Sequence, residues 1–148
     1  MIEAGQSAPN IHLKTDTGED FDLAAHRGQK IVLYFYPRAD TPGCTVEACE
    51  FRDNREIAKK ALVVGVSPDT PHAQAKFKSK FDLNFTLLAD ADKKAATDYG
   101  LLKEKNMYGK KVMGVERTTY IIDEQGKIAH IFPKVKPEGH AAEVLAAL

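Results

Sequence analysis

The two cysteines of this chain lie close together, in a segment whose residue types favour thiol chemistry. Cys44 and Cys49 are the only cysteines among 148 residues, and both lie in YFYPRADTPGCTVEACEFRD, residues 34–53. Thr41 can act as the N-cap of a helix whose first residue is Pro42. Cys44 then occupies the third helical position, close to free backbone N–H groups and to the positive end of the helix dipole. Both features favour the thiolate, which is the nucleophilic form of cysteine.

Cys49 follows five residues after Cys44 on the same expected helix. Five residues of α-helix advance about 7.5 Å and rotate about 140° net, which places the two Cα atoms about 8.6 Å apart. A disulfide needs a Cα separation of roughly 4.4–6.8 Å. The two thiols therefore cannot be bridged while the helix is intact, and a bridge requires its first turns to unwind. In the intact helix we expect Cys49 to face the core on nearly the same side as Val46.

The residues alone leave three uses open for such a pair: inert packing, metal binding and redox chemistry. Free cysteines are among the most buried residues, so inert packing thiols are common. Structural zinc needs four ligands at recognisable spacing. The histidines that might complete such a set are scattered, and we expect them to be surface or packing residues: His12, His26, His72, His130 and His140. We therefore expect no metal site, and the place of Cys44 at a helix start favours redox chemistry.

Composition and charge exclude several other classes. Lysine plus arginine and aspartate plus glutamate both number 21, so the formal net charge is zero and gives no argument for nucleic acid or an anionic membrane. The N-terminal MIEAGQSAPNIHL lacks the pattern of a secretory signal, and no apolar run approaches the ~20 residues of a membrane helix. We expect one domain, residues 1–148, in the cytoplasm. Persistent structural disulfides are rare there, which again favours redox use of the cysteines.

The elements that must position Cys44 alternate between strands and helices. Residues 30–36, KIVLYFY, form a β-branched and aromatic run that is typical of a strand buried on both faces. This strand leads directly into the cysteine helix, which we expect to continue to about Lys60. Ligands in such sheets bind outside the carboxyl ends of the strands, so Cys44 lies where chemistry is expected.

The rest of the chain predicts an α/β fold of three layers with a mixed sheet. An edge strand is expected at 10–15, with a turn at 17–18 and a short returning strand. The lysine-containing segment 101–114 is interpreted as a solvated loop. The other expected elements are strands at 61–67 and 85–90, helices at 70–81, 92–100 and 138–148, and a hairpin at 117–132.

Several segments together resemble the peroxiredoxins. Pro37, Thr41 and Cys44 stand in the arrangement P-x-x-x-T-x-x-C, and the second cysteine five positions on is similar to the bacterioferritin comigratory protein, or Q-type, subgroup. Further likeness lies in GQSAPNIHLKTDTGEDFDL, in VVGVSPDTPHAQAKF and in MYGKKVMGVERTTYIID, which carries the family's arginine, here Arg117. The resemblance covers nearly the whole chain. It implies a thioredoxin-like fold with an N-terminal β-hairpin.

The resemblance also implies roles for individual residues. Cys44 would be the peroxidatic cysteine, Thr41 would hydrogen-bond its sulfur and the peroxide, and Pro37 would shield the pocket from water. Arg117 would hold the thiolate and polarise the O–O bond, aided by the backbone N–H groups of Gly43 and Cys44. Fixed donors aimed at developing charge lower a barrier, and loss of one can slow a reaction about 10²–10³-fold.

Cys49 would be the resolving cysteine, which forms an intrachain disulfide with the sulfenic acid of Cys44 after the helix unwinds. The implied substrates are hydrogen peroxide and alkyl hydroperoxides, and the implied reductant is thioredoxin or a similar dithiol protein. We expect a monomer without metal or organic cofactor. Two other hypotheses are a thiol–disulfide oxidoreductase acting on proteins, whose usual C-x-x-C the chain lacks, and a non-enzymatic holdase or redox-sensing binding protein.

Overall fold

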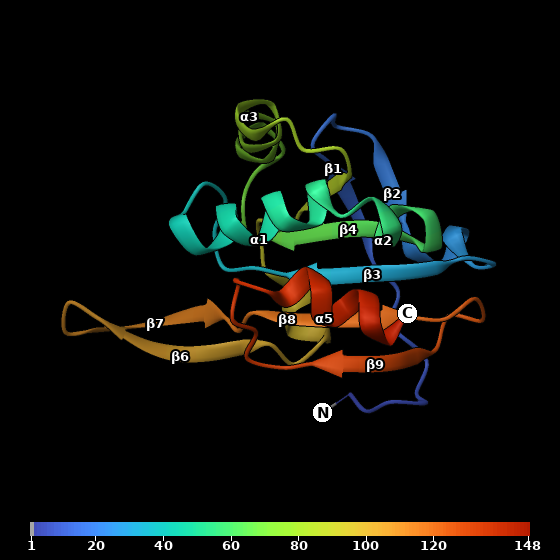
Figure 1. Cartoon of the computed structure of the whole chain (residues 1–148). Coiled ribbons are helices and arrows are strands. Elements are labelled where there is room, and N and C mark those ends of the chain that lie inside the picture. The colour runs from blue at the N-terminus through green and yellow to red at the C-terminus, as the bar shows by residue number, and fades with distance from the viewer. Residues whose placement is uncertain (1) are drawn as a thin grey trace.

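A mixed sheet of seven strands forms the centre of the fold, in the order β2-β1-β5-β4-β3-β8-β9 (Figure 1). The computed structural model describes residues 2–148, apart from the side chain of Met107. The central strand β3 runs parallel to β4 and antiparallel to β8. The strands of this sheet are β1 (His12–Thr15), β2 (Asp20–Asp22), β3 (Lys30–Phe35), β4 (Ala61–Ser67), β5 (Thr86–Ala89), β8 (Thr118–Ile122) and β9 (Ile128–Phe132).

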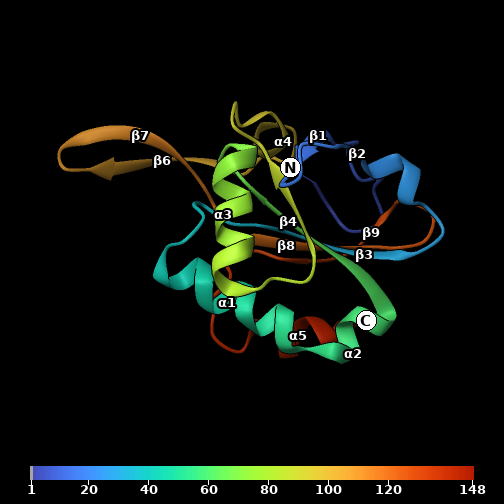
Figure 2. The ribbon, with the colours of Figure 1, turned by 90° about the horizontal axis from the view of Figure 1, so that it is seen from above.

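Helices cover both faces of this sheet, which gives the three layers that the sequence predicts (Figure 2). The helices α1, α2, α3 and α5 pack on one face, and α4 packs on the other with the short 3₁₀ helix and the N-terminal segment. Within residues 2–148, no helix combines the length and the apolar character that crossing a bilayer requires. The helices are α1 (Pro42–Asp53), α2 (Arg55–Lys60), α3 (Pro71–Phe81), α4 (Lys94–Asp98) and α5 (His140–Ala147), and the 3₁₀ helix spans Leu23–His26.

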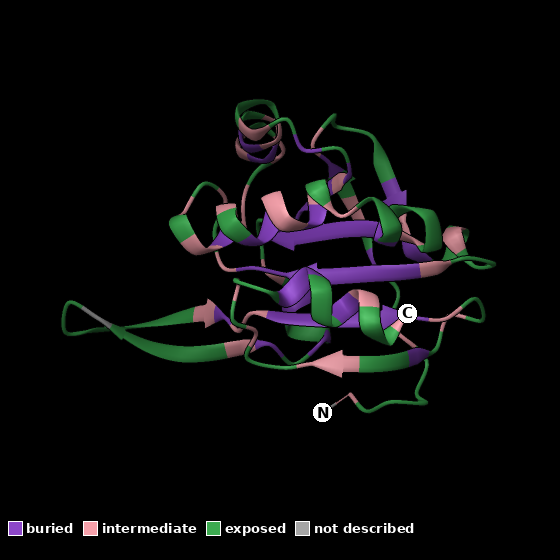
Figure 3. Cartoon of the chain, viewed as in Figure 1, coloured by how far each residue is buried: buried purple, intermediate pink, exposed green. Residues whose placement is uncertain are grey.

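Strand β3 contributes to the two cores on either side of the sheet. Its residues from Ile31 onward are buried, as are β4 from Val63 onward and all of β8 (Figure 3). Alternate side chains along β3 point to opposite faces, because successive residues of a strand do so. Ile31, Leu33 and Phe35 pack under α4, whereas Val32, Tyr34 and the following Tyr36 pack under α1 and α3. This two-sided burial fixes the point at which the chain leaves β3 and begins α1.

The arrangement of strands and helices differs from the sequence-based expectation in three places. Strand β1 is not at the edge, because it pairs with β2 on one side and β5 on the other. The expected helix to Lys60 is interrupted at Asn54, whose side chain accepts a hydrogen bond from the backbone N–H of Ile57 and begins α2. Segment 101–114 is not an open loop but a β-hairpin, formed by β6 (Leu102–Met107) and β7 (Lys110–Val115).

Gly65 provides a test of the packing between β3 and β4. It pairs with Tyr34 in the parallel register, and a Cβ atom at Gly65 would lie 3.0 Å from both the Tyr34 ring and Leu87 Cδ2. We expect Gly65→Ala to lower the free energy of unfolding by about 1–3 kcal/mol, because the added methyl group overpacks the core. Urea denaturation measures this change. The control is Ser79→Ala on the exposed side of α3, for which we expect a change within about 0.5 kcal/mol; an equally small change for Gly65→Ala would contradict the packing described.

Candidate active site

Cys44 lies at the start of α1, just beyond the carboxyl end of β3, and its side chain is buried. Asp69 links the connection between β3 and α1 to the end of β4. Its Oδ2 accepts hydrogen bonds from the backbone N–H of Ala39 at 2.8 Å and from Oγ of Ser67, the last residue of β4, at 2.7 Å. Asp40 in this connection has a left-handed backbone (φ 58°) and pairs with Lys80 on α3. The first turn of α1 therefore begins at a defined place above the sheet.

Arg117 brings a positive charge to the sulfur of Cys44. It lies just before β8, and its Nη2 donates a hydrogen bond to Cys44 Sγ at 3.2 Å. Its Nη1 donates to Glu47 Oε1 at 2.7 Å, and Glu47 is itself buried, three residues after Cys44 on α1. The guanidinium thus bridges a thiol and a carboxylate that lie on the same side of the helix. Arg117 therefore places a positive charge in direct contact with the sulfur of Cys44.

Gly43 allows this approach of Arg117 because it has no side chain. A Cβ atom at Gly43 would lie 3.3 Å from Arg117 Nη2 and 3.3 Å from Pro137 Cγ. Pro137 belongs to the segment before α5, so three distant parts of the chain meet at the start of α1. Gly43 is therefore a steric requirement of the site, in addition to offering its backbone N–H.

Thr41 is the N-cap residue of α1, as the sequence predicts, but its side chain does not cap the helix. The backbone is extended there (φ −101°, ψ 156°), and the hydroxyl donates to the backbone carbonyl of Arg38 at 3.0 Å. The hydroxyl proton of Thr41 is therefore used in this bond, and the hydroxyl oxygen can still accept a hydrogen bond from another donor. The expected contact between this hydroxyl and the sulfur stays a prediction, as does the shielding role of the half-buried Pro37.

Comparison with known proteins identifies the family. The model of the AhpC/TSA family matches residues 4–131. The chain belongs to this family. The putative peroxiredoxin bcp of Coxiella burnetii is 50% identical over 149 residues, which cover 99% of each protein. Peroxiredoxin Bcp of Bacillus subtilis is 46% identical over 149 residues, which cover 99% of this chain and 95% of the relative.

Solved structures agree with this assignment. The bacterioferritin comigratory protein of Xanthomonas campestris, described for its alkyl peroxide reduction activity, has a TM-score of 0.90 at 37% identity and covers 98% of this chain and 96% of its own. The peroxidoxin BcpB of Mycobacterium tuberculosis has a TM-score of 0.87 at 35% identity, with coverage of 99% and 96%. The thioredoxin-like fold and the resemblance to the peroxiredoxins are thus confirmed, and the chain is a thiol-dependent peroxidase.

Burial controls the charge of Glu47 in this peroxiredoxin. Removal from water raises the pKa of its carboxyl from the ordinary 4.5 to about 7, although the charge and the hydrogen bond of Arg117 oppose that rise. Burial of Arg117 by itself lowers the pKa of its guanidinium, but the charges of Glu47 and Cys44 and the hydrogen bonds to both raise it above its ordinary value. Arg117 is therefore a permanent cation, whereas Glu47 changes its charge near neutral pH. The net charge around the sulfur follows the state of Glu47.

Cys49 lies one turn and a half after Cys44 and is half-buried, and the two thiols are unpaired. The expectation that it faces the core beside Val46 is wrong, because Val46 is 37% exposed and Cys49 is partly accessible. The buried side of α1 is formed instead by Cys44, Glu47, Ala48 and Phe51. The intact helix therefore keeps the two thiols on different sides, in agreement with the helical geometry that the sequence implies.

Two contributors to the site escaped the sequence analysis. Glu47 is a charged residue at spacing i, i+3 from Cys44, so the helical period alone places both on one side of α1. Pro137 could not be found in this way, because only the folded chain brings the segment before α5 against Gly43. Among residues 2–148, apart from the Met107 side chain, no cluster of side chains has the composition of a metal site.

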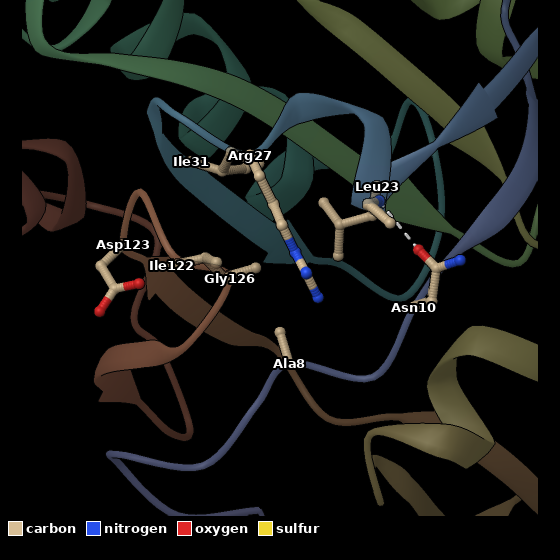
Figure 4. A pocket seen from close by; sticks show the side chains of 9 residues that line it. Ala8, Asn10, Leu23, Arg27, Ile31, Ile122, Asp123 and Gly126 are labelled. Atoms are coloured by element: carbon tan, nitrogen blue, oxygen red, sulfur yellow. Dashed lines mark hydrogen bonds between the residues drawn. The ribbon is translucent and has the colours of Figure 1, made fainter.

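Another pocket lies at the opposite end of the sheet, far from Cys44 (Figure 4). The side chain of Arg27 lies across it, close to Gly126 and near the apolar Leu23. Its volume of about 30 Å³ suits a water-sized molecule rather than a cofactor. It is lined by residues at the amino end of β3 and the carboxyl end of β8, so it has no part in the chemistry of Cys44.

The raised pKa of Glu47 predicts a pH dependence of stability. An unfolded chain ionises this carboxyl near pH 4.5, whereas the folded chain holds the proton up to about pH 7. Rising pH between these values therefore favours the unfolded state, and the effect levels off above pH 7. We expect the contribution of Glu47 to the free energy of unfolding to fall by roughly 1–3 kcal/mol from pH 4.5 to pH 8.

Urea denaturation of the wild type and of Glu47→Gln at both pH values measures this contribution. Glutamine keeps an acceptor for Arg117 and removes the titration, so the variant should gain stability relative to the wild type as the pH rises. Parallel pH profiles for the two proteins would contradict the prediction, because they would show that Glu47 has the same pKa in the folded and unfolded states.

Gly43→Ala tests the close approach of Arg117. The added methyl group forces the guanidinium or Pro137 to move by a few tenths of an ångström, which weakens the bond to Cys44. We expect the rate constant for hydrogen peroxide, measured by stopped-flow fluorescence or competition, to fall about tenfold, because small misplacements of catalytic groups slow reactions strongly. The control is Val46→Ala, which removes exposed atoms from the same helix, and equal rates for the two variants would contradict the steric argument.

Proposed function

We propose that Cys44 attacks hydrogen peroxide and alkyl hydroperoxides, with Arg117 as the residue that holds both the thiolate and the reacting oxygen. The observation that carries this proposal is the 3.2 Å hydrogen bond from Arg117 Nη2 to Cys44 Sγ at the start of a helix. The remaining N–H groups of the guanidinium are suited to a developing oxyanion, because arginine offers five donors in a fixed plane. Free N–H groups of the first helical turn add to this stabilisation.

The reaction needs no further group. The thiolate of Cys44 attacks the terminal oxygen of ROOH, the S–O bond forms as the O–O bond breaks, and the electron pair leaves with RO⁻. This leaving group takes a proton and departs as ROH, while the cysteine becomes a sulfenic acid. A shallow, mainly apolar groove formed by Pro42, Gly43, Val46 and the segment 136–138 lies beside the start of α1. This groove supports alkyl hydroperoxides as substrates, since it gives an alkyl group an apolar surface near the sulfur.

Cys49 resolves the sulfenic acid in this proposal. Its thiol loses its proton and the sulfur attacks the Cys44 sulfur; the S–S bond forms as the S–O bond breaks, and the released hydroxide takes the thiol's proton and leaves as water. The step requires the first turns of α1 to unwind, and the distribution of tertiary contacts supports a local opening. The hydrogen bonds that tie α1 to other segments after Cys49 are those of Glu50 and Arg52. The Glu50 carboxylate accepts from the backbone N–H of Gly139, Arg52 Nη1 donates to the carbonyl of Phe81, and Asn84 Nδ2 donates to the carbonyl of Arg52.

The part of α1 before these anchors is held mainly by Arg117, through Cys44 and Glu47. The Thr41 side chain does not cap this end of α1. The first turn therefore lacks a stabilisation of about 1 kcal/mol that a side-chain N-cap typically gives a helix. Unwinding of residues 42–49 can therefore stop at Glu50 and leave the rest of the helix in place. We further propose that thioredoxin or a similar dithiol protein reduces the disulfide, and that the enzyme works as a cytoplasmic monomer.

Variants of the two cysteines test this proposal. With thioredoxin as the reductant, we expect Cys44→Ser to show no turnover and Cys49→Ser to consume one equivalent of peroxide and then stop, since no disulfide can form for thioredoxin to reduce. Peptide mass spectrometry of the wild type after one equivalent of peroxide should reveal a Cys44–Cys49 link.

Two outcomes would sink separate parts of the proposal. Full peroxidase activity of Cys44→Ser would remove the enzymatic assignment of that residue. Repeated turnover of Cys49→Ser with thioredoxin alone, together with unlinked peptides in the wild type, would remove the resolving role of Cys49 and leave the attack by Cys44 intact.

A further inference from the structure

The β6–β7 hairpin is a separate two-stranded sheet that projects from the body of the molecule (Figures 1 and 2). Residues 103–106 and 108–113 are all exposed, so neither face of the outer hairpin packs on the core. Its base is fixed to the body, because the backbone N–H of Glu116 donates to the carbonyl of Leu101 and Lys93 Nζ donates to that of Met113. Isolated two-stranded hairpins are marginally stable in water, so this arm is not explained by its own packing.

The tip of the hairpin carries an aromatic ring in an unfavourable backbone position. Tyr108 is fully exposed and has φ 54°, and Gly109 follows with φ 77°. Two-residue turns of this kind favour asparagine, aspartate or glycine at both positions, because other residues adopt positive φ less readily. Because the Tyr108 side chain is fully exposed, packing against the described residues does not explain a tyrosine at this position. Exposed tyrosine is typical of interaction surfaces, where the ring supplies contact area and the hydroxyl a hydrogen bond.

One face of the hairpin gathers positive charge. Residues directly opposite one another in an antiparallel pair share a face, and so do residues two apart. Lys103 is opposite Gly114 and Lys105 is opposite Val112, so both lysines share their face with Lys110, which is two residues from Val112. None of these three lysines pairs with a carboxylate of the described residues, whereas Lys111 on the other face pairs with Glu104. We call Lys103, Lys105 and Lys110 the lysine face.

The conformation of Lys105 depends on a glycine. A Cβ atom at Gly114 would lie 2.7 Å from Lys105 Cδ and 2.8 Å from its Cε, so this side chain lies flat across the partner strand. Between Leu102 and Val115 the hairpin has four lysines and one glutamate, a net charge of 4 − 1 = +3 in a chain whose net charge is zero. The hairpin is therefore a local positive region, and the partner that it fits is an acidic surface.

The position of the hairpin relates this surface to Cys44. β7 ends at Val115, two residues before the arginine that holds the sulfur. Both views of the ribbon show the hairpin leaving the same end of the molecule as the first turn of α1 (Figures 1 and 2). A protein bound to the hairpin would therefore lie at the end of the molecule where α1 begins.

We propose that the lysine face, with Tyr108 at its tip, docks the acidic surface of the dithiol protein that reduces the Cys44–Cys49 disulfide. This inference rests on the proposed function. In the exchange, one thiolate of the reductant attacks a sulfur of the disulfide and forms a mixed disulfide. Its second thiolate then displaces the enzyme's sulfur, so two electrons pass to the enzyme and the reductant leaves oxidised. The hairpin takes no part in these bonds; it raises the rate at which the two proteins meet in a productive orientation.

The test compares two reductants on the same variants. The triple variant Lys103→Gln, Lys105→Gln, Lys110→Gln is assayed with an acidic thioredoxin, reduced by its reductase and NADPH, and separately with dithiothreitol. We expect kcat/KM for thioredoxin to fall about tenfold at low ionic strength and the difference from wild type to shrink in high salt, since exposed charges are screened. Turnover with dithiothreitol should be unchanged. The matched control Lys60→Gln, Lys76→Gln, Lys127→Gln removes the same charge from exposed positions elsewhere and should behave as wild type with both reductants.

A second variant separates docking from folding. Tyr108→Asn suits the positive φ of the turn, so the melting temperature should stay equal or rise while kcat/KM for thioredoxin falls. Unchanged thioredoxin kinetics in the triple variant would overturn the docking proposal. If the triple variant instead lost binding to duplex DNA or to anionic vesicles while its thioredoxin kinetics stayed intact, the lysine face would serve a different partner, and the proposal would also be overturned. A wild type that turns over with dithiothreitol but not with thioredoxin would also overturn it and leave the peroxidase function standing. Absence of turnover with either reductant would instead count against the proposed function itself.

Discussion

The contact between the Arg117 guanidinium and the Cys44 sulfur depends on pairing between distant parts of the chain. The two residues are 73 positions apart, and they meet because β3 and β8 are antiparallel neighbours, so that the end of one strand lies beside the start of the other. Phe35 at the end of β3 pairs with Thr118 at the start of β8. Both cores beneath and above β3 support this register, since a slip by one residue would exchange buried side chains between the two faces.

The same contact explains residues whose types would otherwise look unrelated. Gly43 is small because the guanidinium and Pro137 occupy the space beside it. Glu47 is tolerated in a buried position because its Oε1 accepts a hydrogen bond from Nη1 of Arg117. A buried carboxylate without such a partner would be strongly unfavourable. One Oε2 atom of Glu47 still has no hydrogen-bond partner in the described structure, as is true of the nearby Tyr34 hydroxyl. Burial is the main cause of the raised pKa of Glu47, and the contact with Arg117 offsets only part of it.

Local signals in the sequence were sufficient for most elements and for the position of Cys44. The buried run of β3, the Thr-Pro starts of α1 and α3, and the hairpin between β8 and β9 all follow from short-range rules. The sequence-based expectations were wrong where tertiary packing determines the position of a residue, or where an element is exposed on both faces. The β6–β7 hairpin has no buried face and thus no alternation of apolar residues to reveal it. The exposure of Cys49 and the approach of Pro137 depend on how α1 and the segment before α5 pack, which residue spacing along one helix does not report.

The break at Asn54 gives α1 an end that is independent of α2. The Asn54 side chain accepts a hydrogen bond from the backbone N–H of Ile57 and so caps the start of α2. The second helix therefore has its own N-terminal cap and does not depend on α1 for it. Ile57 stays fully covered beneath α2. In the proposed resolving step, residues 42–49 unwind ahead of Glu50 while Ile57 stays buried under α2. The proposed opening is therefore confined to one short segment: of residues 42–49, only Cys44, Glu47 and Ala48 would leave a buried position.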